Sequence, residues 1–201
     1  MKRDKVKDFY FHKAKRENFS ARSVYKLENI QEKYKLIRPK SRLLDLGAAP
    51  GSWSEYICKL LGPGGYLMAL DIQPLSPSAV EKIKKSGVDF LFLEQSVLDP
   101  LPSDLLPFDL IVSDMAPATQ GNRLVDTQNS LHLIEAAYEI AKKNLKPGGH
   151  FIVKLFQSPD TVEASKAWGR AFEMSKLYRP PAVHKDSKEV YFVGQNFKVS
   201  S

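Results

Sequence analysis

The stretch Leu43-Leu44-Asp45-Leu46-Gly47-Ala48-Ala49-Pro50-Gly51-Ser52-Trp53 decides the fold, because an apolar run stops here in a loop of small residues. Such a run predicts a buried parallel strand, and small residues let a ligand approach the loop backbone closely. Residues 53–61 then carry apolar side chains at helical spacing. The stretch is therefore predicted to be a strand, a ligand-binding loop and a helix; the alternative is a tight strand-to-helix turn without a ligand.

The rest of the chain continues this alternation of strands and helices. Apolar runs predict further strands at 66–71, 88–93, 108–114, 150–156 and 188–194. Amphipathic patterns predict helices at about 21–34, 78–86, 127–145 and 160–174. The first of these is predicted to have a hydroxyl cap, and Pro147-Gly148-Gly149 is predicted to end the third. Successive strand-helix-strand units imply a parallel sheet covered on both faces, so the fold class is α/β.

Length and composition favour one globular domain over residues 1–201, because 43% of the residues are hydrophobic and can form a substantial core. No apolar run approaches the roughly 20 residues that a membrane span needs, and the charged amino terminus lacks the apolar core of a signal peptide. The single Cys58 and four scattered histidines offer no metal-ligand spacing. We therefore expect a cytoplasmic protein without a metal.

Positive charge is concentrated at the amino terminus. Residues 1–42 hold 14 Lys and Arg against 5 Asp and Glu, whereas the remaining chain is slightly acidic, with 16 against 18. This asymmetry predicts a polyanion-binding surface, and the alternative is a solvated, partly disordered arm. The predicted phosphate contacts are Lys2, Arg3, Lys5, Lys7, Lys13, Lys15, Arg16 and Arg22, and the aromatic residues placed to stack on bases are Phe9, Tyr10, Phe11 and Phe19.

The glycine loop indicates a nucleoside cofactor without a pyrophosphate. From Gly47 the pattern is G-x-x-P-G, so Ala49 replaces the middle glycine of a dinucleotide loop, and no Gly-Lys-Ser/Thr of a P-loop follows. Asp71 ends the second predicted strand, about 20 residues past the loop, where a carboxylate accepts hydrogen bonds from ribose hydroxyls. S-adenosylmethionine fits this arrangement.

Four charged residues carry the predicted chemistry. Asp114 and Glu189 lie at strand ends, Lys154 interrupts an apolar strand, and Lys26 lies in the basic amino-terminal region. An unpaired buried ammonium is costly, so Lys154 should be paired or functional. Transfer of a methyl group to a ribose hydroxyl needs a proton acceptor, and burial, a second lysine and a cationic cofactor all favour the neutral amine. The alternative is a set of structural ion pairs.

The chain resembles the FtsJ/RrmJ family of RNA ribose 2'-O-methyltransferases, and the shared motifs cover nearly its whole length. They are Ala21-Arg22-Ser23-Val24-Tyr25-Lys26-Leu27, the opening stretch from Leu44 to Trp53, Ser113-Asp114-Met115-Ala116-Pro117, Val153-Lys154-Leu155-Phe156-Gln157 and Ser187-Lys188-Glu189-Val190-Tyr191. The resemblance implies a class I methyltransferase fold, Rossmann-like, with a mainly parallel seven-stranded sheet flanked by helices.

The resemblance also assigns roles to residues. The family's catalytic Lys-Asp-Lys-Glu tetrad falls on Lys26, Asp114, Lys154 and Glu189, with Lys154 as the proton acceptor. Its cofactor contacts fall on Gly51, Trp53, Asp71 and Asp114. Where bacterial members have Gly-Asp after the third strand, near the adenine, this chain has Gln95-Ser96. Ser96 is the expected replacement, and Asp99 is the alternative.

The resemblance further implies an RNA substrate. Bacterial members of this length methylate a uridine ribose of 23S ribosomal RNA within the large subunit, whereas relatives modify tRNA or mRNA caps. We expect the ribosomal substrate, a monomeric enzyme and an RNA-binding amino-terminal segment at about 1–42. A tRNA methyltransferase, a non-catalytic RNA-binding or ribosome-assembly factor, and a methyltransferase for a small molecule or a protein are the alternatives.

Overall fold

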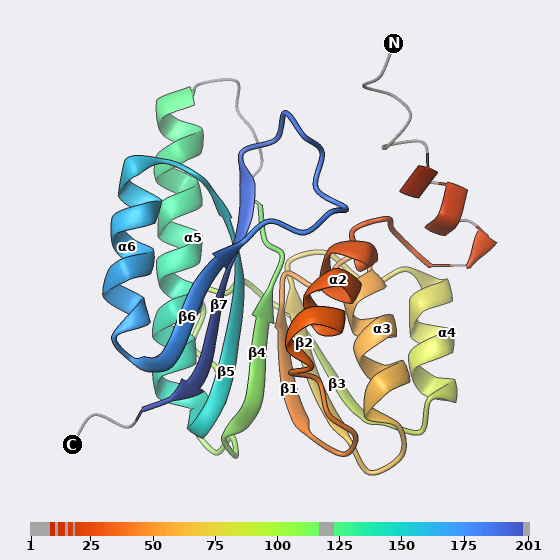
Figure 1. Cartoon of the computed structure of the whole chain (residues 1–201). Helices are drawn as coiled ribbons and strands as arrows, with labels where there is room; N and C mark the ends of the chain where they lie inside the picture. Colours follow the sequence, from red (N-terminus) through yellow and green to blue (C-terminus); the bar gives the residue numbers. More distant parts are fainter. Residues whose placement is uncertain (1–8, 11, 15, 18, 117–122, 199–201) are drawn as a thin grey trace.

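A seven-stranded sheet forms the centre of the molecule (Figure 1). The computed structural model describes residues 9–10, 12–14, 16–17, 19–116 and 123–198. In this part of the chain the strands are β1 (Arg42–Leu46), β2 (Tyr66–Asp71), β3 (Asp89–Glu94), β4 (Phe108–Ser113), β5 (Leu145–Phe156), β6 (Phe172–Tyr178) and β7 (Glu189–Phe197). Their order is β3-β2-β1-β4-β5-β7-β6, and β7, which lies between β5 and β6, runs antiparallel to the other six strands. The predicted seven-stranded, mainly parallel sheet is confirmed.

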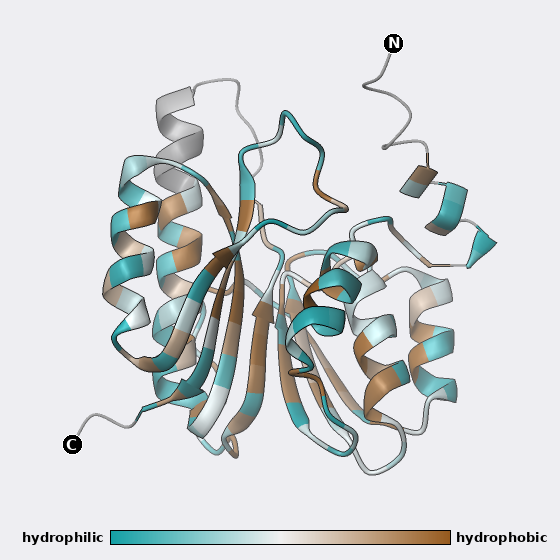
Figure 2. Cartoon of the chain, viewed as in Figure 1, coloured by the Kyte–Doolittle hydropathy of each residue, from teal (hydrophilic) through white to brown (hydrophobic). Residues whose placement is uncertain are grey.

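Helices cover both faces of the sheet. Helices α2 (Val24–Tyr34), α3 (Ser52–Leu61) and α4 (Pro77–Lys85) lie on one face, and α5 (Arg123–Asn144) and α6 (Pro159–Gly169) lie on the other (Figure 1). Figure 2 shows hydrophobic strands between helices whose outer sides are hydrophilic. The arrangement is the doubly covered α/β sheet that the strand-helix alternation predicts.

The central strands are apolar throughout because both of their faces are buried. Leu43 and Leu110 belong to the cluster beneath α2 and α3, whereas Leu44 and Ile111 belong to the cluster beneath α5 and α6. Successive side chains of a strand point to opposite faces, so each face needs its own apolar residues. All four side chains have no exposed surface.

The predicted helix over 160–174 is wrong in its last five residues. Helix α6 ends at Gly169, and β6 begins at Phe172 and pairs with β7 at the edge of the sheet. Residues 173–176 are exposed although they are in a strand. An edge strand with few buried side chains lacks the alternation by which a strand is recognised in a sequence.

Two predicted helix signals also differ from the structure, although α5 ends at Asn144, one residue before its predicted end. Pro147-Gly148-Gly149 does not end α5, because β5 begins at Leu145, which pairs with Phe108. The register between β4 and β5 shifts between Phe108 and Leu110, so this segment is an irregular start of β5 rather than a helix stop. The expected hydroxyl cap of α2 is absent too, since Ser23 forms no side-chain cap and its hydroxyl lies 3.0 Å from that of Ser52.

Candidate active site

The site lies at the carboxyl ends of the neighbouring strands β1 and β4, after which the chain continues to opposite faces of the sheet. After β1 the chain enters α3 on one face, and after β4 it continues toward α5 on the other. Such a switch point opens a crevice at the carboxyl ends of the strands. The glycine loop 47–51 and Asp114 therefore reach the same crevice.

The glycine loop has a backbone shape that demands its glycines. Gly47 has a φ of 78° and Gly51 a φ of 116°, both in the left-handed region that other residues rarely adopt. A Cβ on Gly51 would lie 2.5 Å from the Cβ of Ala79, and one on Gly47 would overlap Met115. The amide of Ala49 donates to Asp71 Oδ2 at 2.9 Å, which ties the loop to the end of β2.

A cavity of about 430 Å³ opens beside this loop. Its walls come from the glycine loop, the end of β2, the turn after β3 and the residues after β4, with Leu133 of α5 closing one side. The lining residues are Gly47, Ala49, Leu70, Asp71, Ile72, Gln73, Gln95, Ser96, Val97, Asp114, Met115, Ala116 and Leu133. The volume is within the range of pockets that hold a small-molecule cofactor.

The structure brings three of the five predicted cofactor residues to this cavity. Asp71, Ser96 and Asp114 line it, whereas Gly51 and Trp53 do not. Gly51 is the amino-terminal cap of α3. Trp53 is buried, donates from Nε1 to the carbonyl of Ser23 at 3.0 Å, and so joins α3 to the start of α2. A cofactor role for Gly51 and Trp53 stays a prediction.

The turn after β3 distinguishes Ser96 from Asp99. Ser96 lines the cavity, whereas Asp99 turns back and accepts from the Ser96 amide at 2.9 Å. Sequence reasoning did not select Gln95, which also lines the cavity, and whose Nε2 is buried without a hydrogen-bond partner among the described residues. A buried amide donor without a partner indicates a ligand that carries an acceptor. Asp71, Gln95 and the apolar walls thus fit a nucleoside cofactor.

The four predicted catalytic residues form two ion pairs at the carboxyl edge of the sheet. Lys154 Nζ lies 3.1 Å from Asp114 Oδ1 and also donates to the Asp114 carbonyl. Lys26 Nζ lies 2.7 Å from Glu189 Oε1 and 2.9 Å from Oε2. Lys154 is only 6% exposed, so its charge is removed from most of the solvent. The predicted pairing of Lys154 is confirmed by this geometry, and the catalytic roles stay predictions.

Tyr191 joins the two ion pairs and was missed by sequence reasoning. Its hydroxyl lies 2.8 Å from Asp114 Oδ1 and 2.9 Å from Glu189 Oε1, and its one proton serves one carboxylate at a time. Burial, followed by the charges of Asp114 and Glu189, raises the pKa of Tyr191 well above its usual value. Tyr191 therefore remains a neutral donor. Its position two residues after Glu189 on one strand, and so on the same face, was the signal that could have found it.

Strand register explains why these side chains meet. Lys154 of β5 pairs with Tyr191 of the antiparallel β7. Ser113, just before Asp114, pairs with Val153, just before Lys154, in the parallel neighbours β4 and β5. The Tyr191 ring also packs against Trp53, with ring centroids 5.9 Å apart. Backbone pairing and aromatic packing thus fix the cluster.

The described part of the basic amino-terminal segment packs on α2. The rings of Tyr10 and Tyr25 lie 5.3 Å apart, and Lys13 pairs with Glu28 at 3.1 Å. Lys13 is thus engaged within the protein, whereas Arg16 and Arg22 are exposed. The predicted contacts Lys2, Arg3, Lys5, Lys7, Lys15 and Phe11 lie outside the described residues.

The sheet order, the glycine loop, the acid at the end of β2 and the charged cluster beside the cavity define a class I methyltransferase fold. Residues 19–197 match the family model for FtsJ-like methyltransferases, and the chain belongs to this family. Among the described residues, no group of His, Cys, Asp or Glu could hold a metal ion. No helix in that part of the chain is long and apolar enough to cross a membrane.

Curated relatives match over nearly the whole chain. A protein of Syntrophobacter fumaroxidans named ribosomal RNA large subunit methyltransferase E is 43% identical, over 97% of this chain and 98% of its own length. A protein of Acinetobacter baumannii with the same name is 42% identical, over 98% of this chain and 90% of its own length. A solved ribosomal RNA methyltransferase of Plasmodium falciparum shares the fold, with a TM-score of 0.72, 23% identity, and coverage of 89% of this chain and 98% of that one.

Proposed function

We propose that the protein transfers a methyl group from S-adenosylmethionine to a ribose 2'-hydroxyl in RNA, and that the target is a uridine of 23S ribosomal RNA in the large subunit. The linked cluster of Lys26, Asp114, Lys154 and Glu189 beside the cavity carries the proposal. The names of the relatives, ribosomal RNA large subunit methyltransferase E, support the choice of RNA.

The cavity residues would hold the cofactor. Asp71 would accept from its ribose hydroxyls, while Gln95 and Ser96 would face the base. When bound, S-adenosylmethionine supplies an electrophilic methyl group on a sulfonium that leaves as a neutral thioether. Asp114 lines the cavity and also pairs with Lys154, so it connects the cofactor site to the catalytic cluster.

Lys154 would act as the proton acceptor. The reaction forms an oxygen–carbon bond and breaks a carbon–sulfur bond, so the ribose hydroxyl must lose its proton. In its neutral form Lys154 would take that proton at Nζ and become the ammonium that pairs with Asp114 in the structure, and Asp114 would orient the amine. Lys26 and Glu189 would neutralise each other and line the acceptor side of the cluster. In this direct displacement no covalent enzyme intermediate forms.

The same proposal covers the setting of the reaction. The enzyme would act in the cytoplasm as a monomeric single domain, with residues of the basic segment 1–42 contacting RNA. The net charge of +9 in this segment supports that contact, because phosphate neutralisation dominates the affinity for nucleic acids.

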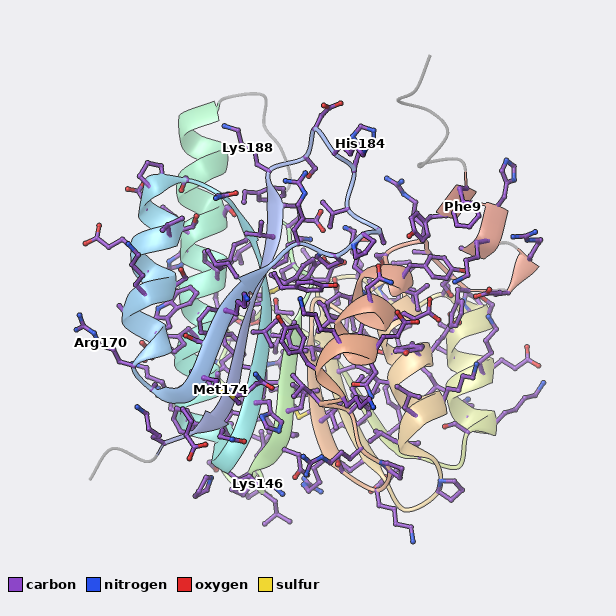
Figure 3. All side chains as sticks on the ribbon, in the orientation of Figure 1. Phe9, Lys146, Arg170, Met174, His184 and Lys188 are labelled. Carbon is purple, nitrogen blue, oxygen red and sulfur yellow. The ribbon has the colours of Figure 1, made fainter. Side chains whose placement is uncertain are left out.

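The test is to supply labelled S-adenosylmethionine with isolated ribosomal subunits, total ribosomal RNA and tRNA, and to map the labelled ribose. Lys154→Ala should abolish transfer while cofactor binding, measured by calorimetry, survives. Lys146→Ala is the matched control, since Lys146 lies on the same strand at the opposite edge of the sheet (Figure 3). Absence of label in every RNA would refute the function, and full activity of Lys154→Ala would refute the role of Lys154.

A further inference from the structure

The loop 179–188, which joins β6 to β7, holds a second group of positive charges far along the chain from the amino-terminal segment. The chain after residue 42 is slightly acidic, yet residues 176–188 contain Lys176, Arg179, Lys185 and Lys188 against the single carboxylate of Asp186. The loop lies beyond the carboxyl ends of the parallel strands, at the same end of the molecule as the described amino-terminal residues (Figure 1). It leads directly into Glu189, the first residue of β7.

Arg179 organises this loop from within. Its Nη2 lies 2.8, 2.7 and 2.5 Å from the carbonyl oxygens of His184, Lys185 and Ser187, which share its two N–H donors. Carbonyl oxygens carry partial negative charge that would repel a phosphate. Because one guanidinium engages three of them, the loop keeps a fixed course and its backbone repels an anion less.

The loop is also fixed to its surroundings at both ends. The amide of Ala182 donates to Asn29 Oδ1 of α2 at 3.1 Å, and Val183 is buried in the core cluster beneath that helix. The Lys188 carbonyl accepts from the amide of Gln157, just after β5, at 2.8 Å. The loop is thus a preorganised element attached to α2 and β5, which carry Lys26 and Lys154.

The lysines of this anchored loop remain available to a ligand. Lys185 and Lys188 are exposed, and within the described part of the chain neither ammonium group forms a hydrogen bond or an ion pair. Figure 3 shows Lys188 and His184 at the upper edge of the molecule, with Phe9 of the amino-terminal segment along the same edge. Phe9 is 56% exposed and can stack on a base.

We infer that the loop 179–188 is a second RNA-backbone contact, in which Lys185 and Lys188 bind phosphates next to the target nucleotide. The inference rests on the proposed function and adds a specific surface to it. Phosphate contacts position a strand without reading its sequence. A contact from this loop and one from the amino-terminal segment would hold the RNA at two places beside the carboxyl ends of the strands, where the catalytic cluster lies.

The test compares the wild type with the double variant Lys185→Ala/Lys188→Ala. The control is Lys84→Ala/Lys143→Ala, which removes the same charge from two exposed lysines near the ends of α4 and α5, at the opposite edge of the sheet. RNA affinity is measured against salt concentration. Because each lost phosphate contact on single-stranded RNA lowers the slope of log K against log salt by about 0.7, the loop variant should lose about 1.4.

The expected result is a higher KM for RNA in the loop variant, with kcat at saturating RNA and cofactor affinity unchanged, and no change in the control. A salt slope equal to that of the control overturns the inference. So does a defect confined to assembled subunits while free RNA binds normally, because the loop would then contact ribosomal protein. If the wild type methylates no RNA, the proposed function fails, and the salt slopes still decide whether the loop binds RNA.

Discussion

Asp45 is a carboxyl group on β1 that is completely buried beneath the glycine loop. Its Oδ2 accepts from the Ser54 hydroxyl at 2.7 Å, but its Oδ1 has no hydrogen-bond partner among the described residues. Burial raises the pKa of Asp45 from 3.8 to about 7, and the charges of Asp114 and Asp71 add to this effect. Asp45 is therefore neutral in the folded protein over much of the pH range in which an unfolded chain would ionise it.

The higher pKa of Asp45 in the folded state makes the protein less stable as the pH rises. Below the unfolded pKa of 3.8 the carboxyl group holds its proton in both the folded and the unfolded state, so its ionisation does not change the free energy of unfolding. As the pH rises toward the folded pKa of about 7, only the unfolded state releases its proton, so the free energy of unfolding falls. At about 1.4 kcal/mol per pKa unit, the loss reaches roughly 2 kcal/mol near pH 5 and roughly 4 kcal/mol near pH 8.

The substitution Asp45→Asn should therefore stabilise the protein, because the amide has the shape of the protonated carboxyl group and cannot ionise. The expected gain is roughly 2 kcal/mol near pH 5 and up to about 4 kcal/mol near pH 8. Urea denaturation followed by circular dichroism at both pH values measures it. Asp104→Asn, at an exposed position, is the control and should change little. A gain that is the same at both pH values, or no gain near pH 8, would refute the reasoning.

Two further predictions concern the site. Asp71→Ala should raise the Kd for S-adenosylmethionine by about 10- to 100-fold, because a charge-assisted hydrogen bond is lost. Asp99→Ala is the control and should leave the Kd nearly unchanged. Calorimetry measures both Kd values, and equal effects would contradict the assignment of Asp71 to the cavity wall. Tyr191→Phe should lower kcat by about 10-fold or more with unchanged cofactor affinity, because Asp114 and Glu189 lose their shared donor. Unchanged kcat in single-turnover assays would show that the tyrosine only packs.

The parts of the fold that were predicted correctly are those with a strong local pattern. Strand β2 was predicted with its observed bounds, because its apolar run ends at Asp71 and is buried on both sides. Strand β6 was missed because it lies at the sheet edge, where Glu173 and Lys176 are exposed and Phe172 alone is deeply buried. Burial of the edge depends on the pairing with β7, which no local pattern reveals.

The candidate site shows the same division. Asp71 and Lys154 were found because a charge at the end of an apolar strand, or inside one, is unusual. Gln95 and Tyr191 were not found, because a glutamine in a turn and a tyrosine in a strand are ordinary residues in a sequence. Gln95 is important because its Nε2 is a buried donor without a hydrogen-bond partner among the described residues. Tyr191 is important because its hydroxyl lies within hydrogen-bond distance of the carboxylates of Asp114 and Glu189.

The sequence by itself determined the glycine loop, the strand-helix alternation and the identity of the charged residues, because glycine placement and apolar periodicity are properties of residues that are neighbours in the chain. Only the tertiary structure decided which charges meet. Lys26 and Glu189 are 163 positions apart, and they pair because α2 packs beside β7 at the edge where β4 and β5 end. Strand order and register are set by packing across the whole sheet, so the partners of a catalytic lysine follow from the assembled core.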